Sequence, residues 1–174
     1  EISACLVGSE MCIRDSYNTV SVRHILIKAE KSANGTYTDE AKAAAKARAE
    51  EILAEFNSGD KTEDSFAELA NKYSEDEGSN TNGGLYENIA KGQMVQEFND
   101  FCFAGHKAGD TGIVYGESSS YAGYHVMYFV GEGEQYSDYL AKSSLLTSDM
   151  NAWLEELTSA YETSVGGGIR FVGK

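Results

Sequence analysis

Two segments of the chain alternate apolar and polar residues with the period of a β-strand. In the segment TVSVRHILIK, residues 19–28, His24 falls on the apolar face. In the segment GYHVMYFVG, residues 123–131, His125 does the same. The apolar residues that share these two faces are Val20, Val22, Leu26, Met127 and Phe129. The pattern predicts two strands, each with a histidine at a position that otherwise holds a large apolar side chain.

Two helices are predicted after the first strand. Between residues 39 and 56, apolar side chains recur every three or four positions, which is the helical period. Thr38 or Asp39 can cap the start of this helix, and Gly59 can end it. Its apolar stripe consists of Ala41, Ala45, Ala49, Ile52, Leu53 and Phe56. A second, shorter helix is predicted by the stripe Phe66, Leu69, Ala70 and Tyr73.

The rest of the first 134 residues completes an α+β pattern. Residues 74–85 are rich in glycine, serine and asparagine and indicate a loop, and residues 95–105 indicate a short helix. Residues 109–117 and 121–134 then read as two strands joined by a serine-rich turn, which favours an antiparallel hairpin. The order of strand, helices and hairpin predicts a small antiparallel sheet with helices packed against it.

The two ends of the chain are set apart from this core. Residues 1–16 lack an initiator methionine and resemble translated adapter sequence, so we expect a non-native or disordered leader. Residues 135–174 are predicted to form a C-terminal amphipathic helix and a tail. The apolar stripe of that helix is Leu146, Met150, Trp153, Leu154, Leu157 and Tyr161. This face either folds back on its own domain or docks on a missing N-terminal chaperone segment.

Net charge, apolar runs and cysteine count argue against several classes of binding partner and cofactor. The 174 residues carry a net charge of -14, which would repel nucleic acid and anionic lipid surfaces. No apolar run reaches the roughly 20 residues that a membrane-spanning helix needs. The three cysteines are an odd number without C-x-x-C spacing, so neither a disulfide framework nor a zinc knuckle is indicated.

Candidates for metal binding and nucleophilic chemistry each have a simpler interpretation. The two strand histidines could bind a metal, but a third ligand is hard to find, since His106 lies in a glycine-flanked loop. Asp76–Glu87 imitates a calcium loop at its first and twelfth positions but not at its third and sixth. Cys102 lies between two phenylalanines and is most simply a buried core residue. The alternative is a nucleophile paired with a histidine. We expect no metal and no cofactor.

Four motifs in order resemble the parvulin family of peptidyl-prolyl isomerases. They are VRHILIK, FAELANKYSEDEGSNTNGGLY, GQMVQEFNDFCFAGHKAGDTGIV and YAGYHVMYFVGEGE. The resemblance places a parvulin-like domain at residues 17–134, and it is strongest to bacterial extracytoplasmic foldases. It implies a protein that acts outside the cytoplasm or at the cell surface.

The resemblance also assigns the catalytic set. Family members place two histidines on neighbouring central strands beneath the cleft, and His24 and His125 match both positions. Asp76 matches a position that holds cysteine or aspartate beside the substrate carbonyl. We expect the histidines to form a hydrogen-bonded network that mainly supports the site.

Substrate-binding residues are assigned in the same way. Leu85, Met94 and Phe98 match the apolar pocket that receives the proline ring, and Ser120 falls near the family's site hydroxyl, with Tyr121 beside it. The sequence GGLYENI departs from the commoner Gly-Asp-Leu-Gly pattern. The residue after Leu85 therefore has no secure counterpart in the family.

The resemblance implies non-covalent cis/trans isomerisation of X-Pro bonds in unfolded or secreted client polypeptides. The alternative is a non-catalytic chaperone or peptide-binding module of a larger foldase. Phosphate-directed family members carry clustered arginines after the first strand, whereas residues 29–38 of this chain contain Lys31 as their one basic residue. We therefore expect no requirement for phosphate.

Overall fold

The computed structural model describes residues 17–118 and 120–159. In chain order the elements are β1 (Asn18–Lys28), α2 (Asp39–Ser58), α3 (Glu63–Tyr73), β2 (Leu85–Ile89), α4 (Gln96–Cys102), β3 (Thr111–Glu117), β4 (Ala122–Gln135) and α5 (Tyr136–Ser159). The chain divides into two compact units between Tyr136 and Ser137. The expected leader, residues 1–16, lies outside the described residues.

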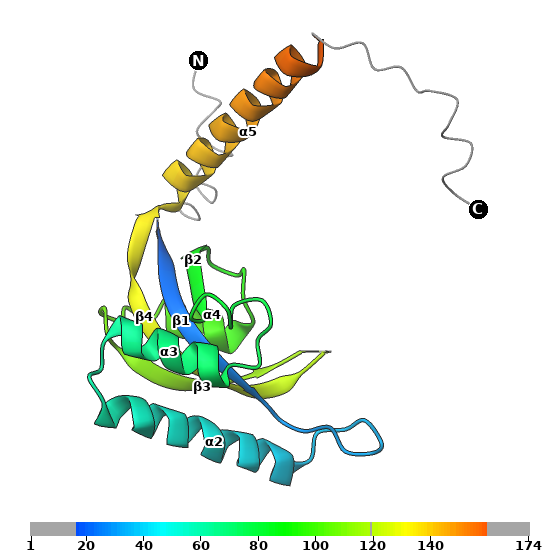
Figure 1. Ribbon diagram of the computed structural model, residues 1–174, viewed down its shortest axis with the longest axis vertical. Coiled ribbons are helices and arrows are strands. Elements are labelled where there is room, and N and C mark those ends of the chain that lie inside the picture. The colour runs from blue at the N-terminus through cyan, green and yellow to red at the C-terminus, as the bar shows by residue number, and fades with distance from the viewer. Residues whose placement is uncertain (1–16, 119, 160–174) are drawn as a thin grey trace, which may run out of the picture. The chain divides into compact units, whose positions relative to one another are not determined.

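The described residues of the first unit form a four-stranded antiparallel sheet in the order β2-β1-β4-β3 (Figure 1). The two strands that carry the histidines, β1 and β4, are neighbours at its centre. The α+β class and the antiparallel hairpin β3-β4 are therefore confirmed. Strand β2 was not predicted, because its five residues follow a glycine-rich loop and only Ile89 is fully buried.

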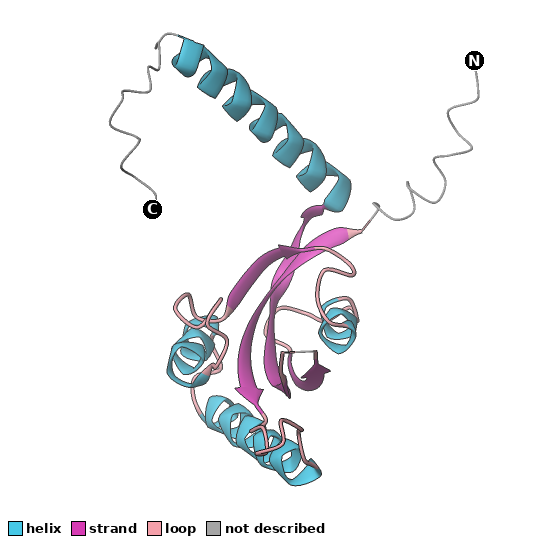
Figure 2. Ribbon diagram, turned by 90° about the vertical axis from the view of Figure 1, so that its right-hand side faces the viewer, coloured by secondary structure: helices cyan, strands magenta, loops and turns pink. Residues whose placement is uncertain are grey.

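Alternation along the central strands divides the core into two layers. Helices lie on both sides of the sheet (Figure 2). On one face, Ile25, Ile27, Val126 and Tyr128 pack against α2 and α3. The helical residues buried in this layer are Ala45, Ala49, Ile52, Phe56, Phe66 and Ala70. This arrangement confirms both predicted helix stripes, because all six buried positions belong to them.

The opposite face of the sheet packs against α4. Its buried members are Val20, Val22, Ile89, Phe98, Phe101, Cys102, Met127 and Phe129. Cys102 is 1% exposed, so the interpretation of this residue as part of the core is confirmed. Burial raises the pKa of the Cys102 thiol to about 12, which keeps it protonated and unreactive. The two histidines lie on this same face of the sheet.

Local signals in the sequence fix the helix ends. Thr38 caps α2 by accepting a hydrogen bond from the backbone N–H of Ala41, and Gly59 follows its last turn. At the start of α3, Thr62 and Ser65 satisfy each other's backbone N–H groups in a capping box. These ends set the length of the two helices that support the strand bearing His24.

The second unit contains most of α5, a helix of 24 residues with no buried residue among those described. Its exposed large apolar side chains are Leu140, Leu145, Leu146, Met150, Trp153, Leu154 and Leu157. Tyr161, which we assigned to the same stripe, lies outside the described residues. Within the described ranges, every helix is too short or too polar to cross a membrane. What covers the apolar face of α5 stays a prediction.

Candidate active site

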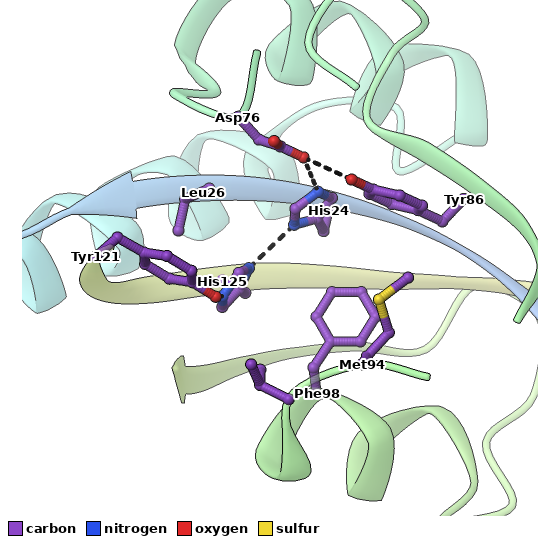
Figure 3. Close-up of a pocket in the computed structure, with 9 residues that line it drawn as sticks. His24, Leu26, Asp76, Tyr86, Met94, Phe98, Tyr121 and His125 are labelled. Atoms are coloured by element: carbon purple, nitrogen blue, oxygen red, sulfur yellow. Dashed lines mark hydrogen bonds and ion pairs between the residues drawn. The ribbon is translucent and has the colours of Figure 1, made fainter. Parts of the chain in front are cut away.

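A cavity of about 170 Å³ opens on the face of the sheet that carries the histidines (Figure 3). The central strands, the loop after α3, strand β2, the start of α4 and the β3-β4 turn all contribute side chains to it. The residues that line it are His24, Leu26, Asp76, Tyr86, Met94, Val95, Phe98, Tyr121 and His125. Five of the seven residues that we assigned to the site therefore meet in one cavity.

The two histidines form the floor of the site. They stand on neighbouring strands, where Leu26 pairs with His125 and His24 pairs with Met127. The Nδ1 atoms of His24 and His125 lie 3.0 Å apart, and their rings are nearly parallel. Each residue is 3% exposed. A hydrogen bond therefore joins two buried rings, as we expected from their positions on one face.

Asp76 anchors this pair from the loop after α3. Its Oδ2 atom accepts hydrogen bonds from His24 Nε2 at 2.9 Å, Ser79 Oγ at 2.6 Å and Tyr86 Oη at 3.0 Å. Its Oδ1 atom accepts one from the backbone N–H of Gly78 at 3.2 Å. The bond from His24, more than any other contact, holds the pKa of Asp76 far below its ordinary value. Asp76 is therefore an ionised carboxylate whose oxygens are already occupied.

The charge on Asp76 orders the protons of the whole network. A carboxylate only accepts hydrogen bonds, so His24 Nε2 must donate to it. With both rings neutral, His24 Nδ1 then accepts a hydrogen bond from the Nδ1–H of His125. His125 Nε2 is left as an acceptor for Tyr121 Oη, 3.0 Å away. The network runs from Tyr121 through His125 and His24 to Asp76.

Burial keeps His125, Tyr86 and Tyr121 neutral. It lowers the pKa of His125 to about 3, and the neighbouring His24 adds to this effect. Burial, followed by the charge of Asp76, raises the pKa of the Tyr86 and Tyr121 hydroxyls. Both tyrosines and His125 therefore hold their neutral forms at neutral pH, with no group poised to attack a substrate.

The apolar wall of the cavity comes from the segment that begins α4. Met94 and Val95 precede the helix, and Phe98 lies in its first turn. The ring of Phe98 meets both histidine rings edge-on, with centroids 5.4 Å from His24 and 5.5 Å from His125. Phe98 is 2% exposed, so it supports the floor as well as the wall. This segment gives the cavity the character of a site for an apolar ring.

Leu85 does not line the cavity, and Tyr86 takes the place that we assigned to it. In the sheet, Leu85 pairs with Arg23, whose side chain bonds Glu63 of α3 on the opposite face. Tyr86 pairs with Val22 and therefore faces the histidines. A shift of one residue along a strand exchanges the two faces. This difference of one position falls in GGLYENI, the segment that departs from the family pattern.

Ser120 is also absent from the cavity lining. Its hydroxyl bonds that of Ser118 within the β3-β4 turn, and its carbonyl accepts a hydrogen bond from Tyr37. The neighbouring hydroxyl of Tyr121 reaches the histidine instead. Gly116 makes room for it, because a Cβ atom there would lie 2.8 Å from His125 Nε2 and 3.2 Å from Tyr121 Oη. The site hydroxyl in this chain is thus a phenol.

Within residues 17–118 and 120–159, no group of three histidine, cysteine or acidic side chains is placed to hold a metal ion. His106, the third histidine, lies 3.5 Å from the Asp110 carboxylate, and its ring contacts that of Phe101 at a tilt of 32°. The carboxylate of Asp76, which begins the segment that imitates a calcium loop, is taken up by the His24 network. The chemistry available in the cavity is therefore that of an apolar wall above a polar, fully bonded floor.

Comparison with known proteins agrees with this site. A family model for the PPIC-type PPIase domain matches residues 10–130. Foldase protein PrsA 4 of Bacillus cereus is 35% identical over 120 residues, which is 68% of this chain and 34% of that protein. Foldase protein PrsA 1 of Listeria innocua is 30% identical over 159 residues, 87% of this chain and 46% of that protein. The chain belongs to the PPIC-type, or parvulin, family of peptidyl-prolyl isomerase domains.

Solved structures share the fold. A crystal structure of a PpiC-type peptidyl-prolyl cis-trans isomerase domain aligns with a TM-score of 0.53 and 23% identity, covering 69% of this chain and 95% of that one. PrsA from Bacillus subtilis aligns with a TM-score of 0.53 and 24% identity, covering 85% and 52%. The chain spans about a third to under half of the length of the two curated relatives described above.

Proposed function

We propose that this chain catalyses cis/trans isomerisation of X-Pro bonds without a covalent intermediate. The observation that carries the proposal is the cavity, in which an apolar wall faces two buried histidines whose ring nitrogens are all engaged. Such a site can grip a proline ring but offers no nucleophile. Cys102, the thiol nearest in sequence to the wall, is 1% exposed.

The physical requirement of the reaction suits this arrangement. Amide resonance imposes a rotation barrier of roughly 18–20 kcal/mol on the peptide bond, and no bond has to break. Twisting the amide removes the charge separation between its oxygen and nitrogen, so an apolar surface favours the twisted form over the planar one. A millionfold acceleration needs only about 8 kcal/mol, which positioning and desolvation can supply.

Exchange NMR on a short Ala-Pro peptide tests this proposal. Substoichiometric protein is expected to increase the cis/trans exchange rate, visible as exchange cross-peaks between the two isomers. An exchange rate unchanged by the protein would refute isomerase activity. Cys102→Ala serves as the matched variant, because the thiol takes no part in the mechanism and its removal should leave the catalysed rate intact.

We further propose that the substrates are proline-containing segments of unfolded client proteins outside the cytoplasm or at the cell surface. The relatives named foldase protein PrsA support this assignment, since they match two thirds or more of the chain. Fractionation of cells that produce the full-length protein would test the location. Recovery of the protein in the cytosolic fraction alone would contradict it.

A binding role for α5 is a second proposal, and its exposed apolar face supports it. Seven large apolar side chains among the described residues of this helix are 40% to 67% exposed. We propose that this face docks on a helical chaperone segment of the full-length protein. Trp153 is the only tryptophan among the 174 residues of this chain, and it belongs to this face. In the full-length protein, with any further tryptophan replaced by phenylalanine, the emission of Trp153 should lie at shorter wavelength than in this chain, and an unchanged spectrum would contradict docking.

A further inference from the structure

Two tyrosine hydroxyls at the cavity wall direct their protons away from the cavity. Tyr86 Oη donates to the Asp76 carboxylate, and Tyr121 Oη donates to His125 Nε2 when both histidines are neutral. A phenol that donates its proton keeps two lone pairs on the oxygen. Each tyrosine can therefore still accept a hydrogen bond from a molecule in the cavity, but it has no proton to give.

The remaining polar side chains of the lining are already engaged. His24 uses Nε2 to donate to Asp76 and Nδ1 to accept from His125. Among the described side chains that line the cavity, every N–H and O–H group has a partner inside the network. Their polar contribution to the wall consists of acceptor atoms. This polarity follows from the charge of Asp76, which lies at one end of the network.

Donation into the network also strengthens the two oxygens as acceptors. The bond from Tyr86 ends on a carboxylate, and hydrogen bonds to a charged group are stronger than neutral ones. Hydrogen bonds in a chain polarise one another. A phenol oxygen whose O–H donates to Asp76 or His125 is therefore a stronger hydrogen-bond acceptor. The half-buried position of both tyrosines limits competition from bulk water.

We propose that the cleft holds its substrate through the peptide N–H groups that flank the X-Pro bond, which donate to the oxygens of Tyr86 and Tyr121. The X-Pro carbonyl receives no hydrogen bond from a side chain of the cavity. This inference rests on the proposed isomerase function and defines its substrate class: segments in which residue X and the residue after proline keep their N–H groups. Internal bonds of a proline run lack both and are poor substrates.

Binding the flanking N–H groups while leaving the X-Pro carbonyl without a hydrogen bond also favours catalysis. The carbonyl oxygen carries most of its partial negative charge while the amide is planar, and that charge diminishes as the bond twists. A hydrogen-bond donor at the carbonyl would stabilise the planar form and raise the barrier. A wall of acceptors binds the backbone on either side of the amide without stabilising the planar form.

Backbone ester peptides test the proposal. In an ester analogue, oxygen replaces one N–H group with little change of shape. Three peptides are needed: an all-amide parent Ala-Ala-Ala-Ala-Ala-Pro-Ala, an analogue without the N–H of residue X (the alanine before proline), and one without the N–H of the residue after proline. Each is measured by exchange NMR with the wild type, Tyr86→Phe and Tyr121→Phe. A fourth peptide, with the ester several residues from proline, is the control.

At least one flanking ester should lower the wild-type kcat/KM by about 2- to 12-fold, the range that one neutral hydrogen bond supplies. The penalty should disappear in the phenylalanine variant that lacks the accepting oxygen, because neither partner of that hydrogen bond then remains. Wild-type rates unchanged by both esters would overturn the proposal. An equal penalty in all three proteins would also overturn it, because the loss would then not depend on the tyrosines.

The failure of this inference is separable from the failure of the proposed function. If the wild type does not isomerise the all-amide parent, the isomerase function itself is refuted. If it isomerises the parent, but the loss of kcat/KM caused by each ester is the same with and without the tyrosine hydroxyls, only the proposed hydrogen bonds to Tyr86 and Tyr121 are refuted. Thermal melts of the two variants complete the test, since each keeps its aromatic ring and should remain folded.

Discussion

At the scale of single residues, the site is organised by one partly buried charge. Asp76 is ionised, so the polar groups around it donate hydrogen bonds to it. It thereby fixes the tautomer of His24, which in turn fixes the tautomer of His125. Neither histidine is available as a base, since each ring nitrogen already has a partner. The supporting role predicted from the sequence, in which the histidines fix the geometry of the floor, is compatible with these bonds and stays a prediction.

Acid should weaken the fold through His125. Its pKa is about 3 in the folded protein and 6.5 when exposed, so below pH 6.5 the unfolded chain binds the extra proton first. Stability is therefore complete above about pH 6.5 and falls as the pH drops toward 3, by up to about 1.4 kcal/mol per pH unit. Denaturant melts from pH 7 to 4 would show this slope. His125→Gln should have a flatter profile, and an equally steep one would contradict the assignment.

Replacing His24 should cost stability as well as activity. His24→Ala leaves Asp76, Ser79 and His125 without a shared partner, and a buried unpaired group costs about 1–3 kcal/mol. Met94→Ala is the matched pocket variant, because Met94 is only partly buried and bonds to none of these groups. It should lower kcat/KM about tenfold or more while costing less stability than His24→Ala. A fully stable but inactive His24→Ala would show that the ring acts on substrate.

At the scale of elements, the sequence predicted what periodicity controls. The faces of β1 and β4 and the stripes of α2 and α3 follow from repeats of two and of three to four residues, and each is confirmed. Strand β2 carries no such repeat over its five residues, and its register is set by pairing with β1. The assignment of Leu85 came from matching the family motif, which does not determine the face of a short strand. That face depends on the partner strand β1, which lies more than 60 residues away in the chain.

The loop that delivers Tyr86 depends on Gly84. Its φ of +70° favours glycine, and a Cβ atom there would lie 2.1 Å from the backbone oxygen of His24. Gly84→Ala should therefore displace β2 and lower both stability and activity. Gly92→Ala is the control, since its φ of +79° carries the same backbone strain with nothing within 4 Å. Equal melting temperatures for the two variants would contradict the close approach.

At the scale of the whole molecule, charge bears on the choice of substrate. The chain carries a net charge of -14, and the loop between β1 and α2 contributes a single lysine, Lys31, which lies over the ring of Tyr37. One lysine does not provide the two-pronged grip that arginine gives to a phosphate. We therefore expect the chain to favour neutral or basic client segments over acidic ones.

Phosphorylation before proline should consequently hinder turnover. Phosphoserine adds about two negative charges, which the acidic protein repels and Lys31 alone cannot compensate. Matched phosphoserine-proline and alanine-proline peptides, compared at moderate salt, should show poorer turnover of the phosphorylated one. A severalfold preference for the phosphorylated peptide would refute this expectation.

We propose that the apolar cavity above the paired histidines isomerises X-Pro bonds without a nucleophile. The most direct test is the catalysed exchange rate of an Ala-Pro peptide with the wild type, Met94→Ala and Cys102→Ala under identical conditions. We expect catalysis by the wild type, retention of it by Cys102→Ala and a loss of about tenfold or more in Met94→Ala. An exchange rate that none of the three proteins increases, or catalysis that Cys102→Ala abolishes while it stays folded, would contradict isomerisation by this cavity.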